Sequence, residues 1–312
     1  MITVAEERTT DFDATARIAT EAFGSKDVQF SPARMKWLYE RGFGRGCAVI
    51  AAFDGNKKVG QIVLLHQKLC LGGRAVVTTQ LIDLFILQAY RSPTLVRRIY
   101  KEVERLCEAS QIRIVVTLPN EHSAPLNERF MKLRTFLRLP VRIGVSLWWL
   151  RRPHLNYSGR LDALPKSEAI NLLSGFATPL IENGPCWDAE TLCERISDPT
   201  CDYAVHATAN CLLVSSTRRT RGITHVLLCG FFARPEAAIT TSEVDELIRA
   251  ACRFWKRPIF VYAGINKSLS RLPGFAIPAR YRQPILVQLR DFESDEAMVR
   301  FDRFQLTDCD FV

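Results

Sequence analysis

The chain has 312 residues but lacks any apolar run near the roughly 20 residues that span a bilayer. Its longest apolar runs, such as Val226–Ala233 and Val145–Leu150, have the length of buried strands. The first residues are acidic where a secretory signal peptide would be basic and then apolar. The composition, with 47% hydrophobic and 24% charged residues, is that of a globular protein. We therefore expect a cytoplasmic protein with two cores, because the length exceeds one typical domain.

Disulfide and zinc signatures are also missing, although the sequence contains ten cysteines. There is no Cys-x-x-Cys pair, and Cys186, Cys193 and Cys201 do not have the spacing of a zinc site. Six of the other cysteines lie in apolar stretches, where a free thiol behaves as a small hydrophobe. The sequence therefore predicts free cysteines in a reducing compartment, and no metal.

Positive charge is concentrated in the first half of the chain. The net charge is +9, with 24 Lys and Arg against 14 Asp and Glu up to Leu155, and 18 against 19 beyond it. A basic half indicates an anionic partner: the phosphates of a cofactor, an acidic carrier protein or nucleic acid. Nucleic acid is disfavoured because the arginines form short pairs and no basic stripe interleaved with aromatic residues.

Hydrophobic periodicity predicts an α/β chain in which strands and helices alternate in a similar order in the two halves. In the first half we expect an antiparallel meander that runs into one right-handed β-α-β crossover, and in the second half a repeat of part of it. The expected strands are 2–4, 47–53, 59–71, 75–87, 112–118, 141–150, 203–207, 211–217, 223–232, 259–263 and 284–289. The expected helices are 13–23, 32–41, 95–107, 123–133, 163–180, 189–196, 241–255 and a short one at 267–272. The expected domains are 1–152 and 153–312, with the linker near residues 151–154.

Three motifs of the first half, taken together, resemble the GCN5-related N-acetyltransferase (GNAT) superfamily. The start of the family's third strand resembles Val59-Gly60-Gln61-Ile62, and its strand-to-helix stretch resembles Asp83–Arg91. A turn in one subgroup resembles Leu118–Ser123, and the tail of tandem two-domain members resembles Leu306–Asp310. The resemblance implies an α/β mixed-sheet fold with two tandem acyltransferase domains, the second a degenerate copy.

The implied reaction moves an acyl group from acetyl-CoA or a longer acyl-CoA to the amine of a small molecule or amino sugar. In the family the fourth and fifth strands splay, so that the acyl-pantetheine arm lies between them, and the pyrophosphate binds at the next helix start. Thr94 and Val96 stand where the family's phosphate loop has glycines, while Ser92 and Pro93 form a good helix start. The cofactor-binding residues implied by the match are Phe85, Ile86, Leu87, Arg91, Ser92, Thr94, Leu95, Val96, Arg97 and Asn120.

Catalysis requires a group that takes a proton from the acceptor amine, which in many family members is a carboxylate near the fourth strand. Asp83 is the only charged residue within 76–87, so we expect a general base, an anchor for the amine, or a structural carboxylate. Glu121 is the second candidate, or else a solvated turn residue. The family's usual acid, a tyrosine on the fourth helix, is replaced by Phe130, and Ser123 is a nearby substitute.

Two further functions remain open on these residues. The acyl donor could be an acyl carrier protein, because an acidic donor suits the basic half and would not need the missing glycines. The chain could also be a non-catalytic binding protein on an acyltransferase fold. Tandem folds of this kind are also similar to aminoacyl-ligases that use charged tRNA.

Overall fold

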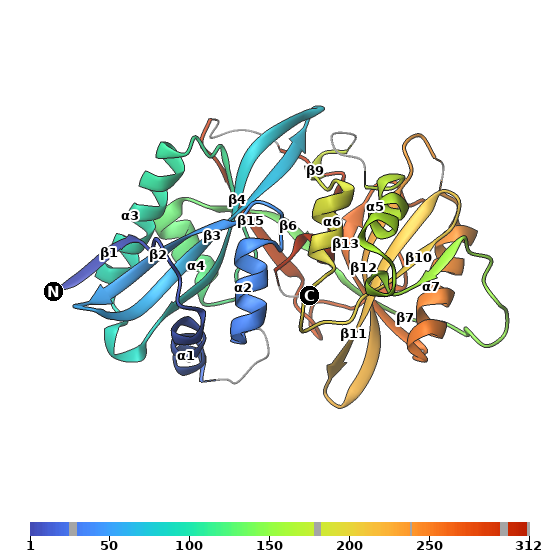
Figure 1. Ribbon diagram of the computed structural model, residues 1–312, viewed down its shortest axis with the longest axis horizontal. Helices are drawn as coiled ribbons and strands as arrows, with labels where there is room; N and C mark the ends of the chain where they lie inside the picture. Colours follow the sequence, from blue (N-terminus) through green and yellow to red (C-terminus); the bar gives the residue numbers. More distant parts are fainter. Residues whose placement is uncertain (25–29, 178–181, 238, 294–298, 311–312) are drawn as a thin grey trace.

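The computed structural model describes residues 1–24, 30–177, 182–237, 239–293 and 299–310, which form two lobes side by side (Figure 1). Each lobe is built on one mixed sheet. In spatial order, the first sheet contains β1 (Ile2–Glu6), β2 (Cys47–Asp54), β3 (Lys57–Leu71), β4 (Arg74–Ile86), β5 (Ile114–Thr117), β15 (Ile285–Asp291) and β6 (Arg134–Leu139), with β9 (Gly184–Pro185) paired to β3. The second contains β14 (Phe275–Ala276), β7 (Val141–Val145), β13 (Ile259–Asn266), β12 (Ile223–Ala233), β11 (Cys211–Thr220), β10 (Ala204–Ala207) and β8 (Tyr157–Gly159), with β16 (Arg303–Gln305) paired to β13.

The main helices agree with the hydrophobic periodicity of the sequence. They are α1 (Phe12–Phe23), α2 (Pro32–Glu40), α3 (Pro93–Ala109), α4 (Ser123–Met131), α5 (Lys166–Ser174), α6 (Ala189–Arg195) and α7 (Thr241–Trp255). The helix expected over 163–180 is shorter, and residues 178–180 lie outside the described part of the chain. The short helix expected at 267–272 is wrong. That segment is a turn, because its backbone is held by other parts of the chain: the Lys267 amide donates to the Asp302 carbonyl.

The meander and crossover predicted from the sequence are confirmed, and both lobes contain them. β2, β3 and β4 are antiparallel, and α3 then leads to β5, which is parallel to β4. In the second lobe β10, β11 and β12 are antiparallel, and α7 leads to β13, which is parallel to β12. The chain therefore contains the same strand–helix–strand unit twice.

Each sheet also contains one strand from the other half of the sequence. β15 lies between β5 and β6 in the first lobe (Figure 1), and β7 lies beside β13 in the second. Only Pro140 separates β6 from β7, and no strand was expected where β6 lies. The domain boundary near residue 152 stays a prediction, and the two sheets exchange strands across it.

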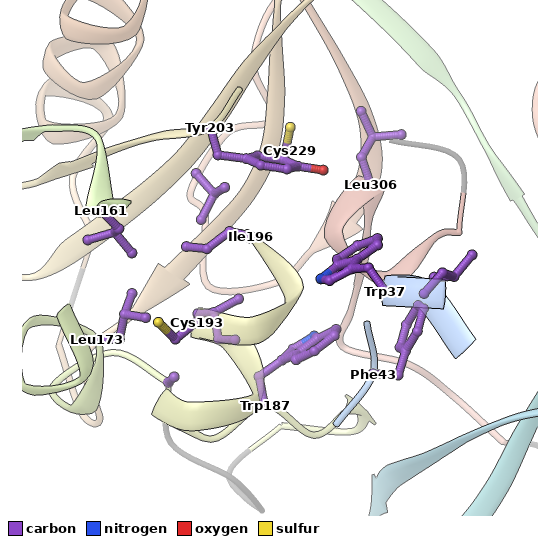
Figure 2. Packing of buried hydrophobic residues seen from close by; sticks show 14 of the residues in the cluster. Trp37, Phe43, Leu161, Leu173, Trp187, Cys193, Ile196, Tyr203, Cys229 and Leu306 are labelled. Atoms are coloured by element: carbon purple, nitrogen blue, oxygen red, sulfur yellow. The ribbon is translucent and has the colours of Figure 1, made fainter. Parts of the chain in front are cut away.

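The lobes share one hydrophobic core. Trp37 and Phe43 of the first lobe face Trp187 and Leu306 of the second (Figure 2). The rings of Phe43 and Trp187 are 5.6 Å apart, and the Trp37 indole nitrogen donates to the Glu194 carbonyl at 3.0 Å. Burying one such aromatic side chain contributes about 1.5–3 kcal/mol. The face of the first sheet that α2 covers is therefore packed against the second lobe.

Other expectations concern thiols, metals and membranes. All ten cysteines are free, as expected. Among the described residues no group of three or more His, Cys, Asp or Glu side chains is placed to hold a metal ion. No helix in the same residues has the length and apolar character needed to cross a membrane.

Candidate active site

The parallel strands β4 and β5 form a fork in the first sheet. They pair at four positions, from Thr78 opposite Ile114 to Leu81 opposite Thr117. At the last position the Thr117 hydroxyl donates to the Leu81 carbonyl at 2.9 Å. β5 then ends, while β4 continues to Ile86, paired with β3 on one edge and with no strand of the described chain on the edge that faced β5. The edge of β4 beyond Leu81 can therefore accept a further extended chain.

Asp83 lies on β4 just beyond the point where the strands part. Its φ of 48° is left-handed, which is unusual for a residue with a side chain. The register between β3 and β4 shifts at this point, so Asp83 belongs to a β-bulge. The bulge turns the half-buried carboxylate toward α2, where the Tyr39 hydroxyl donates to it at 2.7 Å.

The environment of Asp83 favours its protonated form. Burial raises the pKa of Asp83, while the Tyr39 hydrogen bond and the charge of Arg34 partly offset the increase. Tyr39 in turn accepts from the Gln61 amide at 2.8 Å. Burial and the Asp83 charge raise the pKa of Tyr39 well above its ordinary value, so the phenol stays a donor. Asp83 is thus a carboxyl group fixed in position by the Tyr39 hydrogen bond, with a pKa raised toward neutral pH.

A second carboxylate, Asp310, reaches this place from the C-terminal segment. The Gln80 amide donates to its side chain at 3.3 Å, and the Arg34 guanidinium donates to its carbonyl. Arg34 also forms a buried ion pair with Asp198 at 3.2 Å. Burial and the charge of Asp83 raise the pKa of Asp310 to about 6. The two lobes therefore bring two electrostatically coupled carboxylates together.

The segment that carries Asp310 is anchored by buried groups of the second lobe. The buried Arg195 guanidinium donates to the carbonyls of Thr307 and Cys309. The Trp187 indole nitrogen donates to Asp308 at 2.6 Å, and burial raises the pKa of Asp308 to about 6. These bonds hold the backbone immediately before Asp310 in one position.

The start of α3 lies near the end of β4 and is exposed. Ser92 is the N-cap as expected, and its hydroxyl accepts from the Leu95 amide at 3.2 Å. The Val96 amide donates to the Ser92 carbonyl at 3.1 Å. Among the backbone amides of Thr94, Leu95 and Val96, that of Thr94 alone has no hydrogen bond within the described structure.

The positive charges around this helix start differ in their availability. The Arg91 guanidinium is already bonded within the chain, because it donates to the carbonyls of Ile86 and Ala22 at 3.0 and 2.6 Å. Arg97 and Lys101 are exposed and form no ion pair with any described residue. The side chains of Phe85, Ile86 and Leu87 are buried in the core. Only the backbone groups of these residues could therefore contact a bound acyl donor.

The turn after β5 is exposed. The Asn120 side chain accepts from the amides of His122 and Ser123 at 3.0 and 2.9 Å, which caps α4. Ser123 is bonded to Asn120 through its hydroxyl as well. Glu121 is exposed, with His122 3.7 Å away. The structure thus brings Asn120 and Ser123 together, and no described contact joins Glu121 to Asp83.

Sequence reasoning missed Tyr39, Arg34, Gln80 and Asp310 as neighbours of Asp83. The one available signal was the resemblance of Leu306–Asp310 to the tail of tandem proteins. The periodicity of α2 marks Tyr39 only as a buried residue.

The corresponding fork of the second lobe is filled. β12 and β13 pair at three positions, from Val226 opposite Phe260 to Leu228 opposite Tyr262. Beyond them the buried Gln305 side chain accepts from the Phe231 amide at 2.9 Å and donates to the Phe231 carbonyl at 3.1 Å. β16 pairs with the free edge of β13 beside it. The second fork therefore has no room for another chain.

A cavity of about 170 Å³ lies beside Phe43 and Trp187, near the opposite ends of β3 and β4, where Gln67 and Ala75 line it. We assign the site to the first fork instead, because the coupled carboxylates and the exposed helix start lie at its mouth.

The sequence matches no protein-family profile and no curated protein. Solved structures match almost the whole chain. A conserved protein of Enterococcus faecalis, named a probable N-acyltransferase, has a TM-score of 0.67 at 11% identity over 94% of this chain and 73% of its own. A GCN5-related N-acetyltransferase from Anabaena variabilis has a TM-score of 0.62 at 12% identity, covering 93% and 73%. N-myristoyltransferase from Saccharomyces cerevisiae, solved with myristoyl-CoA, has a TM-score of 0.58 at 11% identity, covering 93% and 79%. The chain therefore has the fold of the GCN5-related N-acetyltransferases.

Proposed function

We propose that the protein is an N-acyltransferase that moves an acyl group from acetyl-CoA or a longer acyl-CoA to the amine of a small molecule or amino sugar. The observation that carries the proposal is the difference between the two forks. The first is open beyond Leu81 and has a carboxylate at its mouth, whereas Gln305 fills the second. An unpaired strand edge can bind an extended pantetheine arm, and a carboxylate beside it can take the proton that the acceptor amine must lose.

In the proposed reaction the acceptor arrives as an ammonium ion, and Asp83 takes one of its protons. The amine nitrogen then attacks the thioester carbonyl, the new C–N bond forms, and the C–S bond breaks. After the attack the nitrogen loses its second proton, which reaches the departing thiolate through solvent or through the Ser123 hydroxyl, and a hydroxyl that passes a proton on takes one up in return. Asp83 suits the first step because its raised pKa brings it closer to the operating pH, which favours proton transfer.

Donor binding is proposed to use the backbone edge of Phe85–Leu87 for the pantetheine arm. The Thr94 amide and the exposed Arg97 would face the pyrophosphate at the start of α3, where the helix dipole favours an anion. Ser92 and Leu95 would have an indirect role, because the bond between them forms that helix start. Asn120 would form part of the opposite wall of the fork.

A carrier-protein donor is the second candidate. It is favoured by the helix start itself, where the amides of Leu95 and Val96 already have partners and no glycine allows close approach to a phosphate. A carrier would supply the same pantetheine arm but no adenosine phosphates, and its acidic surface would suit the basic first half.

The test measures both donors in parallel against a panel of primary amines and amino sugars. We expect acyl transfer from CoA thioesters, with saturable CoA binding in calorimetry. Transfer from the carrier alone would replace the first proposal with the second. CoA binding without any transfer across the panel would favour a non-catalytic binding protein.

A further inference from the structure

The second lobe lacks a helix that the first lobe has. In the first lobe α4 lies beside α3: the Tyr100 hydroxyl donates to Asn127, and the rings of Tyr100 and Phe130 stack 6.0 Å apart. After β13 the corresponding stretch, residues 267–274, is described throughout and contains no helix. The place beside α7 that a helix would fill is therefore left open by the chain itself.

A groove of about 460 Å³ occupies this place. Ile248, which lines it, is the eighth residue of α7, as Tyr100 is the eighth of α3. Phe260 forms part of the floor, opposite Gly144 on β7. A Cβ atom at residue 144 would lie 2.2 Å from the Phe260 ring, so the ring packs over residue 144 only because that residue is glycine.

Large apolar side chains on the rim of the groove are exposed to solvent. Leu147, Leu150 and Phe275 are 51%, 71% and 73% exposed. Single exposed leucines are ordinary, but a group of them around one groove is typical of an interaction site.

The charges of the groove are predominantly positive. Arg151, Arg249 and Arg271 line it, and none of them has an ion pair or a hydrogen bond with a described residue. Asp245 is the single acidic residue in the lining. The second half as a whole carries no excess of positive charge, so this concentration is local.

The walls are held in place before anything binds. The Arg142 guanidinium donates to the carbonyls of Pro273 and Gly274 at 2.8 and 2.6 Å. The hydroxyls of Thr241 on α7 and Ser270 are 3.1 Å apart. A fixed groove lowers the entropy lost when a partner binds.

We propose that this groove binds an amphipathic helix of a partner protein that carries acidic residues beside its apolar face. The helix would lie beside α7 as α4 lies beside α3. Its apolar side chains would cover the exposed Leu147, Leu150 and Phe275 of the rim, and its carboxylates would pair with the unpartnered arginines. This interaction is independent of acyl transfer and would use the opposite lobe from the first fork.

The test uses two synthetic helical peptides with the same apolar face, one carrying Glu and the other Lys at the remaining positions. Their dissociation constants are measured on the full chain by fluorescence anisotropy at low salt. We expect the Glu peptide to bind at least tenfold tighter. The double variant Arg249→Glu, Arg271→Glu should weaken it at least tenfold, while the matched surface variant Arg219→Glu leaves it unchanged.

Equal affinity for the two peptides, or no effect of the double variant, would overturn the proposal. If the double variant fails to fold, Leu150→Asp replaces it, because that side chain is exposed and its loss should weaken the Glu peptide similarly. Self-association that Leu150→Asp abolishes would assign the groove to a second copy of the chain. Displacement of the peptide by micromolar decyl phosphate would assign it to a small amphipathic anion.

Discussion

The two forks of the molecule have the same strand order and opposite contents. In each, two parallel strands pair for a few residues and then part at the end that leads to a helix start. The first fork is bordered by Asp83 on a bulge, and the second contains the Gln305 side chain bonded to both backbone groups of Phe231. The strand frame by itself therefore does not decide whether a fork can bind a ligand.

The helix starts that follow the two forks differ in the same way: that of α3 remains available for a ligand, and that of α7 is occupied by the chain. Exposed Arg97 lies near the start of α3, whereas α7 begins with a capping box in which the Glu243 carboxylate returns to Thr240. A carboxylate in the first turn repels a phosphate. The start of α7 is thus occupied by contacts within the chain itself.

The largest expected effect comes from removing the base at the first fork. Asp83→Asn should lower turnover by roughly 10²–10⁴-fold, the range for a lost general base, and leave donor affinity within about twofold. Steady-state kinetics and donor titration measure the two quantities separately. Asp202→Asn, an exposed site in the second lobe, is the matched control. An unchanged turnover would remove Asp83 from the reaction.

The next effect tests the filled fork. Gln305→Ala should lower the free energy of unfolding by about 2–4 kcal/mol, because it leaves the buried Phe231 amide and Tyr262 hydroxyl without the acceptor that they share. Chemical denaturation measures the loss, with the exposed Gln88→Ala as control. The variant should not bind a second CoA. Binding of a second CoA at this site would mean that the Gln305 side chain alone prevents the second fork from binding a ligand.

A smaller effect concerns the pH dependence of the coupled carboxylates. Turnover should rise as the pH passes through the pKa values of the Asp83–Asp310 pair, because the base must be ionised. Tyr39→Phe removes a hydrogen bond to the ionised form of Asp83, which raises its pKa. The acidic limb of the pH–rate profile should move up by about one pH unit, with the plateau retained. A pH–rate profile that does not shift would mean that Tyr39 has no influence on the pKa of the catalytic base.

The smallest effect concerns the electrostatics of the helix start. Arg97→Ala should weaken CoA binding by about 3–10-fold at low ionic strength and by less at high salt, because an exposed charge is screened. Arg219→Ala is the matched control in the second lobe. A loss that does not depend on salt would indicate a contact other than charge pairing.

Local patterns predicted a large part of this arrangement. Apolar stretches separated by turns at 54–56 and 72–73 marked β2, β3 and β4, and the apolar stripe of α3 with Ser92 before it marked the helix and its start. Asp83 attracted attention because a lone carboxylate in an apolar strand needs a partner. The helix predicted at 267–272 failed because contacts with residue 302, distant in the sequence, hold that stretch as a turn.

The sequence by itself determined the order of the main strands and helices, the excess of basic residues in the first half and the conspicuous position of Asp83, since all of these depend on neighbouring residues. The tertiary structure alone decided that β7 and β15 exchange sheets, that Asp310 meets Asp83, and that Gln305 closes the second fork. These pairings join residues tens to hundreds of positions apart. They are selected by burial and hydrogen bonding in the assembled core, which leave no periodic trace along the chain.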